Sequence, residues 1–360
     1  MTRTAVVLFN LGGPDSLAAV KPFLFNLFND RAIIAAPGPV RWFLARMISR
    51  RRAPAAREIY RQIGGSSPLL GLTRDQAAAL EAKLNGGSEA GNGVFKTFIA
   101  MRYWHPFAAE TVKAVRAWAP DRVVLLPLYP QFSTTTTASS VADWRRRAAS
   151  MGLATPTRAV CCYPENTGLV AAYVELVTAG LAEARESAAG APAPRVLFSA
   201  HGLPKKVIAR GDPYQWQVER TVKAIVAGLG DKVVDWVVCY QSRVGPLEWI
   251  GPSIDEEIDR AGGDGVPVVV VPVAFVSEHS ETLVELDIMY RDRAIGAGVP
   301  AYVRVPAVGV HEAFVAGLAE VVLRTLADEN VDEWRADGIE HGSACAAEFG
   351  ACPLGTVITR

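Results

Sequence analysis

Short runs of β-branched and other apolar residues recur along the chain, and most precede a longer stretch in which apolar residues return every three or four positions. The first pattern is typical of a buried strand and the second of a helix with one apolar face. Their alternation predicts a parallel sheet with crossover helices. The predicted strands are 5–9, 95–100, 123–128, 157–161, 195–199, 236–239, 267–273 and 302–305. The predicted helices are 106–118, 140–151, 169–186, 213–229, 253–261, 280–295 and 311–327.

The strands divide evenly between two halves of the chain. We therefore predict an α/β fold of two doubly wound, Rossmann-like halves, each with a roughly four-stranded parallel sheet flanked by helices. Residues 1–165 form the predicted N-terminal half, 166–327 the C-terminal half, and 328–360 a C-terminal extension.

Composition excludes several classes of protein. Lys and Arg total 37, as do Asp and Glu, so no overall positive charge is available to hold a nucleic-acid backbone. The longest uncharged apolar run, 266–277, holds two prolines and is much shorter than the roughly 20 residues that span a bilayer. The N-terminal apolar run is short and has no cleavage site. We expect a folded cytoplasmic protein without a transmembrane helix or signal peptide.

Ligands of open parallel sheets bind beyond the carboxyl ends of the strands. A histidine, His201, follows one such strand, and three carboxylates follow another at the spacing i, i+3 and i+7: Glu278, Glu281 and Glu285. On an α-helix these three share one face, where they could pass protons or bind a divalent cation. A solvated acidic face at a helix start, and a structural histidine, are the alternative interpretation.

Segment 21–57 mixes large apolar residues with arginines. One interpretation is a pair of core helices with basic outer faces. The other is an apolar lip with a basic rim, suited to an amphipathic carboxylate ligand or to an anionic membrane surface.

Several blocks of the chain match one family pattern in the same order: 11–14, 60–68, 101–106, 197–204, 210–214, 240–246, 249–252 and 278–287. Together they resemble the ferrochelatases, which insert ferrous iron into a porphyrin at the end of haem synthesis. The resemblance extends from residue 7 to about residue 322 and implies a chelatase-like fold.

The resemblance implies a role for each matching residue. His201 and Glu281 would be the catalytic pair and would meet the iron, while Glu278, Glu285 and Asp287 would relay protons or metal. The residues expected to bind the porphyrin are Leu11, Tyr60, Ser67, Arg52, Arg102, Tyr103, Trp249 and Phe275. We expect His201 to accept porphyrin protons while apolar walls hold the ring distorted.

The five cysteines are too few and too uneven for a disulfide framework. Some ferrochelatases carry a [2Fe-2S] cluster tied to a C-terminal extension, and such clusters usually take four thiolates. Cys239 lies in an apolar strand, which leaves Cys161, Cys162, Cys345 and Cys352 as candidate ligands. The alternative is that these are reduced thiols without a cluster.

The resemblance implies protoporphyrin IX and ferrous iron as substrates. The alternatives are a chelatase for coproporphyrin III or another tetrapyrrole, and a tetrapyrrole carrier without catalysis. Peripheral contact with the inner face of the membrane, through segment 21–57, and a homodimer are further expectations.

Overall fold

A computed structural model describes residues 1–87, 93–233, 235–243, 245, 247–327, 334–336 and 349–353. The chain forms two compact units. The first comprises Met1–Cys162 and Leu318–Ala336, and the second comprises Tyr163–Gly317 and Asp337–Arg360. The sequence-based division placed its boundary at residue 165 and kept 318–327 with the second half.

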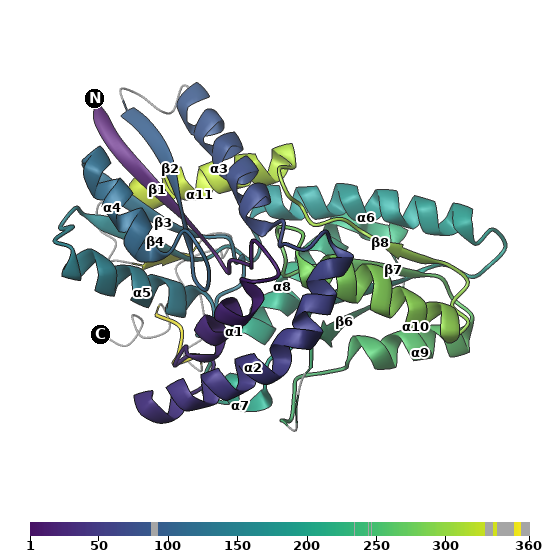
Figure 1. Ribbon diagram of the computed structural model, residues 1–360. Helices are drawn as coiled ribbons and strands as arrows, with labels where there is room; N and C mark the ends of the chain where they lie inside the picture. The colour runs from purple at the N-terminus through teal and green to yellow at the C-terminus, as the bar shows by residue number, and fades with distance from the viewer. Residues whose placement is uncertain are drawn as a thin grey trace. The chain divides into compact units, whose positions relative to one another are not determined.

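The first unit is built on a parallel sheet with strand order β2-β1-β3-β4-β9. Its strands are β1 (Thr2–Asn10), β2 (Gly93–Met101), β3 (Arg122–Pro127), β4 (Thr157–Cys162) and β9 (Trp334–Ala336). Its helices are α1 (Val20–Phe28), α2 (Gly38–Gln62), α3 (Leu69–Gly86), α4 (Ala108–Trp118) and α5 (Thr137–Ser150). Apolar residues of α4 and α5, among them Val112 and Trp144, pack on those of β1 and β3. Figure 1 shows the two helices beside this sheet.

The second unit has a four-stranded parallel sheet with order β6-β5-β7-β8. The strands are β5 (Arg195–His201), β6 (Trp236–Gln241), β7 (Val268–Pro272) and β8 (Tyr302–Arg304). The helical elements are α6 (Thr167–Ser187), α7 (Lys205–Ile208), α8 (Tyr214–Leu229), η2 (Gly230–Lys232), α9 (Ile254–Asp264), the π-helix η3 (Glu281–Met289) and α10 (Tyr290–Gly296). Helix α11 (Glu312–Ala327) begins in this unit, and its later residues belong to the first.

The α/β fold with two parallel sheets is therefore confirmed. Two details differ from prediction: the first sheet gains β9 from the expected extension, and the predicted helix 280–295 begins as a π-helix.

One described helix, α6, is long and apolar enough to cross a membrane, judged by length and composition alone. It is the crossover between the two sheets, and its Leu169, Tyr173 and Val177 are fully buried. A Cβ added at Gly180 would lie 2.9 Å from Val305 and 3.3 Å from Val269 of β7. Such close contact with the sheet is that of a core helix.

Candidate functional site

His201 and Glu281 form a hydrogen-bonded pair in the second unit. His201 ends β5, and Glu281 begins η3, shortly after β7. The two strands are neighbours in parallel register, so their carboxyl ends lie at the same edge of the sheet. Nδ1 of His201 lies 2.8 Å from Oε2 of Glu281, and the side chains are 39% and 21% exposed. The pair is thus part-buried and accessible at the edge where ligands of parallel sheets bind.

Two residues at the end of β6 hold a second carboxylate beside this pair. The Ser242 hydroxyl lies 2.6 Å from Oε2 of Glu285 and 3.2 Å from Oε2 of Glu281. The Gln241 amide donates to the same Glu285 oxygen at 3.3 Å and to the Glu281 carbonyl at 3.2 Å. The buried Ser199 hydroxyl donates to Oε1 of Gln241 at 2.8 Å, which fixes the orientation of that amide.

The electrostatics of the site separate the roles of its groups. Burial opposes ionisation of Glu281, yet the charge and hydrogen bond of His201 hold the pKa of that carboxyl below its usual value. Burial also disfavours the imidazolium, but Glu281 and then Glu285 raise the pKa of His201. Burial, together with the charge of Glu281, raises the pKa of Glu285 to about 7. A hydrogen-bonded histidine–carboxylate pair, in which Glu281 is ionised, therefore adjoins a carboxyl that exchanges its proton near neutral pH.

The predicted row of three carboxylates on one helical face is corrected by the structure. Glu285 does join Glu281, through Ser242. Glu278 instead accepts hydrogen bonds from Arg304 at 2.5 Å and from the Ala307 backbone N–H at 2.9 Å. The α-helical spacing rule fails here because Glu278 precedes η3, which winds with i→i+5 rather than i→i+4 bonds.

Asp287 also lies with Arg304 rather than with His201. Its two oxygens accept from Nε and Nη2 of Arg304 at 2.7 and 2.5 Å. Burial opposes the Arg304 charge, but hydrogen bonds and the charges of Asp287 and Glu278 raise the pKa of the guanidinium overall. Glu278 and Asp287 were expected to relay protons or metal. In the structure both carboxylates are instead paired with the positive charge of Arg304.

Sequence reasoning overlooked His279, although the residue lies inside the block that resembles the family. His279 is buried, and its ring centroid lies 4.7 Å from that of Phe275, a predicted porphyrin-binding residue. Burial lowers its pKa, so the imidazole is neutral, and its buried Nδ1 has no hydrogen-bond partner among the described residues. A histidine followed two residues later by Glu281 was the signal that could have found it.

Two other side chains contact the backbone around His201. Trp249, the remaining predicted residue of this unit, packs on Gly202, where an added Cβ would lie 3.4 Å from the indole. Gly202 therefore leaves room for the tryptophan beside the residue that follows His201. The hydroxyl of Tyr214, which sequence reasoning missed, hydrogen-bonds to the His201 backbone.

The other predicted porphyrin-binding residues lie in the first unit. Leu11, Tyr60 and Tyr103 belong to one hydrophobic cluster with α1 and α2. The Ser67 hydroxyl accepts from the Leu69 backbone N–H at the start of α3. The Arg52 guanidinium stacks on the ring of Phe28, with its carbon 5.8 Å from the centroid.

Arg102 was expected to bind the porphyrin, and in the structure its guanidinium is hydrogen-bonded within the protein. Asp30 accepts from Nη2 at 2.8 Å, and Nε donates to Ser139 at 2.7 Å. The same Asp30 oxygen accepts from the Tyr103 hydroxyl at 2.8 Å and from Ser139. The negative charge of Asp30 therefore neutralises the positive charge with which Arg102 would bind a carboxylate of the ligand.

The described residues do not by themselves supply a [2Fe-2S] ligand set. No group of three or more His, Cys, Asp or Glu side chains within the described ranges could hold a metal ion. Cys161 and Cys162 are fully buried in β4, Cys352 is buried in the second unit, and Cys345 lies outside the described residues.

Comparison with known proteins agrees with the site. The family model described as Ferrochelatase matches residues 3–326. A ferrochelatase of Caulobacter vibrioides is 50% identical over 357 residues, covering 98% of this chain and 97% of its own. One from Wolbachia of Drosophila simulans is 51% identical over 321 residues, covering 89% and 99%.

A solved structure supports the fold alone. SirB from Bacillus subtilis with Fe3+ superposes with a TM-score of 0.52 at 14% identity, covering 91% of this chain and 96% of its own. The strand-end pair, the family match over most of the chain and the relatives at about half identity lead to one conclusion: this chain belongs to the ferrochelatase family.

Proposed function

We propose that the chain is a ferrochelatase that inserts ferrous iron into protoporphyrin IX and forms protohaem. The observation that carries the proposal is the His201–Glu281 pair, 2.8 Å apart at the carboxyl edge of a parallel sheet, with Glu285 beside it. Two pyrrole protons must leave as Fe2+ enters, and the site offers groups that can take both.

In the proposed mechanism His201 accepts the first proton. Its Nδ1 is bonded to Glu281, which leaves Nε2 for a pyrrole N–H. The Glu281 carboxylate stabilises the resulting imidazolium, and this makes His201 a stronger base than a free imidazole.

Glu285 receives the second proton in this proposal. With a pKa raised to about 7, it takes up and releases protons in the physiological range. The Ser242 hydroxyl, within hydrogen-bond distance of both glutamates, gives a short path between them.

Imidazole nitrogen and carboxylate oxygen both suit Fe2+, so His201, before it takes up a proton, and Glu281 can meet the iron during transfer. As two protein ligands they leave the iron open positions for the porphyrin nitrogens. Iron is a substrate in this reaction and must depart with the ring.

Anaerobic incubation with Fe2+ and protoporphyrin IX tests the proposal. We expect the haem spectrum to appear, and His201→Ala to lose about a hundredfold or more in rate while still binding porphyrin. His105→Ala is the matched control, because His105 pairs with Glu110 at the same 2.8 Å on an exposed surface. Full activity of His201→Ala, or haem binding without any insertion, would refute the proposal, the latter in favour of a carrier.

On the basis of the family resemblance, we propose protoporphyrin IX rather than coproporphyrin III as the substrate. Rates of iron insertion measured in parallel with the two porphyrins test this proposal. A higher kcat/KM with coproporphyrin III would reverse it.

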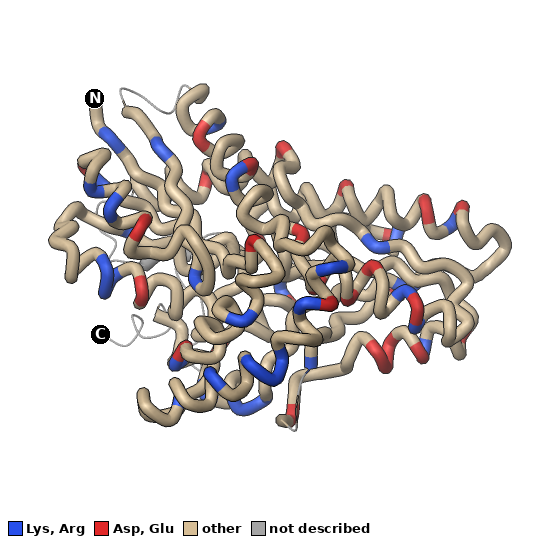
Figure 2. Tube along the Cα trace, in the orientation of Figure 1, with Lys and Arg blue, Asp and Glu red and all other residues tan. Residues whose placement is uncertain are grey.

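We also propose that the protein is cytoplasmic and contacts the inner face of the membrane through α2. Trp42, Phe43 and Met47 are about half exposed or more, at 49%, 62% and 51%. Arginines lie along the same helix, and Figure 2 shows them as a basic stretch. Amphipathic helices of this composition bind anionic lipid surfaces. Sedimentation with anionic liposomes should be lost in the double variant Trp42→Ser, Phe43→Ser.

The homodimer and the [2Fe-2S] cluster of Cys161, Cys162, Cys345 and Cys352 stay predictions. Sedimentation equilibrium tests the first. Analysis of iron and acid-labile sulfide in protein purified without air tests the second.

A further inference from the structure

The edge strand of the first sheet, β2, has its outward backbone groups covered almost completely. Every second residue of β2 turns its N–H and C=O away from β1. These outward residues are Phe95, Thr97, Ile99 and Met101. Exposed edges invite pairing with other chains, and proteins commonly block them.

Side chains and a loop cover this edge one group at a time. Asn85 bonds both the N–H and the C=O of Phe95, each at 3.0 Å. Glu81 accepts from the N–H of Thr97 at 2.6 Å. The Thr111 hydroxyl donates to the C=O of Ile99 at 2.6 Å, and the N–H of Met101 donates to the carbonyl of Pro106 at 2.7 Å.

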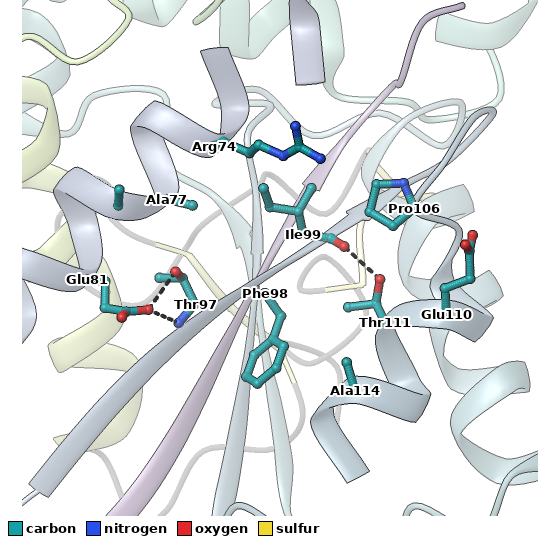
Figure 3. A pocket seen from close by; sticks show the side chains of 11 residues that line it. Arg74, Ala77, Glu81, Thr97, Phe98, Ile99, Pro106, Glu110, Thr111 and Ala114 are labelled. Atoms are coloured by element: carbon teal, nitrogen blue, oxygen red, sulfur yellow. Dashed lines mark hydrogen bonds between the residues drawn. The ribbon is translucent and has the colours of Figure 1, made fainter. Parts of the chain in front are cut away.

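Two adjacent outward backbone groups of β2 lie between these capped groups and are not covered. Within the part of the chain that the structure describes, the C=O of Thr97 and the N–H of Ile99 have no hydrogen-bond partner. They open onto a groove of about 410 Å³, within the range of ligand pockets (Figure 3). Its apolar lining comes from α3, β2, α4 and the loop between β2 and α4, and consists of Ala77, Ala78, Phe98, Ile99, Pro106 and Ala114.

One cation, Arg74, borders the groove. Asn85 reaches Phe95 and Glu81 reaches Thr97, so α3 runs antiparallel to β2. Arg74, about two turns before Glu81, therefore lies toward the Ile99 end, where Figure 3 shows its guanidinium above Ile99. It has no ion pair among the described residues, whereas the carboxylates of Glu81 and Glu110 already accept backbone N–H groups.

The two open groups have the arrangement that a parallel strand uses for a single partner residue. In that pattern the partner's N–H donates to one strand carbonyl, here Thr97, and its C=O accepts from the N–H two residues on, here Ile99. A partner running parallel to β2 points its carboxyl end toward Arg74. Arginine and a backbone N–H together are a strong receptor for a carboxylate.

We propose that this groove binds the free carboxyl-terminal residue of an extended peptide with an apolar side chain. The caps argue for a chain end rather than an internal strand. Asn85 blocks continuation past Phe95, and Pro106 blocks it past Met101. Only about one residue can pair, and its carboxylate then meets Arg74 while its side chain contacts the alanines.

The test is calorimetric titration of the full chain with N-acetyl-alanyl-leucine and with the same peptide as its carboxyl-terminal amide. We expect the acid to bind about tenfold or more tightly than the amide. Arg74→Gln should weaken the acid by the same factor and leave the amide unchanged. The control Lys83→Gln, an exposed cation of α3 outside the groove lining, should bind like the unchanged chain.

Ala78→Phe should block both peptides, because Ala78 is exposed and a larger side chain there fills the groove without disturbing the core. Circular dichroism confirms that this variant is folded. Equal affinity for acid and amide, unchanged binding in Arg74→Gln or Ala78→Phe, or no binding of the acid at millimolar peptide would each overturn the proposal.

Discussion

The Ser242 hydroxyl lies 2.6 Å from Oε2 of Glu285, closer than to Glu281 at 3.2 Å. A hydroxyl has one proton to donate, so the shorter contact identifies Glu285 as its main acceptor. This hydrogen bond lowers the pKa of Glu285 against the larger effects of burial and of Glu281, which raise it. Ser242 thereby sets the pH at which the second carboxyl loses its proton.

Removing the Ser242 hydroxyl should shift the pH profile upward. We expect the ionisation near pH 7 in kcat/KM to rise by about one unit in both Ser242→Ala and Ser242→Gly, because each loses a hydrogen bond to a charged group. The two should differ in stability. Ser242 has a φ of +60°, which glycine adopts without strain, so the glycine variant should be about 1 kcal/mol more stable than the alanine variant. An unmoved profile in both would contradict the assigned role.

Glu285→Gln should change how stability depends on pH. The folded-state pKa of Glu285 is raised to about 7, above its value of about 4.3 in unfolded chains. Between these values the folded state holds the proton more tightly, so the contribution of Glu285 to stability falls as pH rises from about 4.3 to about 7. The melting temperature of Glu285→Gln relative to the unchanged chain should increase across that window. A difference independent of pH would count against the raised pKa.

Arg304→Met should destabilise the second unit by about 3 kcal/mol, because Glu278 and Asp287 lose their shared cation in a part-buried setting. Urea denaturation measures the loss. Arg61→Met is the control: Arg61 and Glu58 form an exposed pair, worth little to stability. Equal effects of the two variants would show that the Arg304 cluster is no more than a surface feature.

Gly168→Ala should be strongly destabilising. A Cβ there would lie 2.2 Å from the Ala313 carbonyl oxygen and 2.8 Å from Cα of Gly317, both in α11. Gly71→Ala in α3 has open space around the new methyl group and should be neutral or up to about 1 kcal/mol stabilising, since alanine is the better helix former. Thermal melts should show a large loss of stability in Gly168→Ala and none in Gly71→Ala, and a similar loss in both would contradict the close helix contact.

The sheets could be predicted because parallel strands are buried on both faces and appear as continuous apolar runs. All four strands of the second sheet are found close to their predicted positions. The same logic places His201 and Glu281 at one sheet edge, since both follow strands that become neighbours. Residues that follow buried strands were thus the informative ones.

The features of the site that the sequence did not predict depend on partners that are distant in sequence. Nothing near Glu278 or Asp287 indicated that Arg304 would pair with both, and Asp30 gave no sign of meeting Arg102. The π-helix changed which carboxylates share a face, because spacing arguments assume 3.6 residues per turn. Strand β9 was missed because three residues with one arginine do not form an apolar run.

The first sheet is completed by residues made late in synthesis. Strand β4 ends at Cys162, but its neighbour β9 ends at Ala336, and Arg158 of β4 bonds the carbonyl of Thr325 at 2.9 Å. At ribosomal rates of about 5–20 residues per second, these partners of β4 are synthesised on the order of ten seconds or longer after β4 itself. The larger part of the second unit, Tyr163–Gly317, lies between them in the chain, so it can fold on the ribosome while the first unit is still unfinished. A nascent chain stalled before residue 318 should therefore protect the second unit from protease before the first.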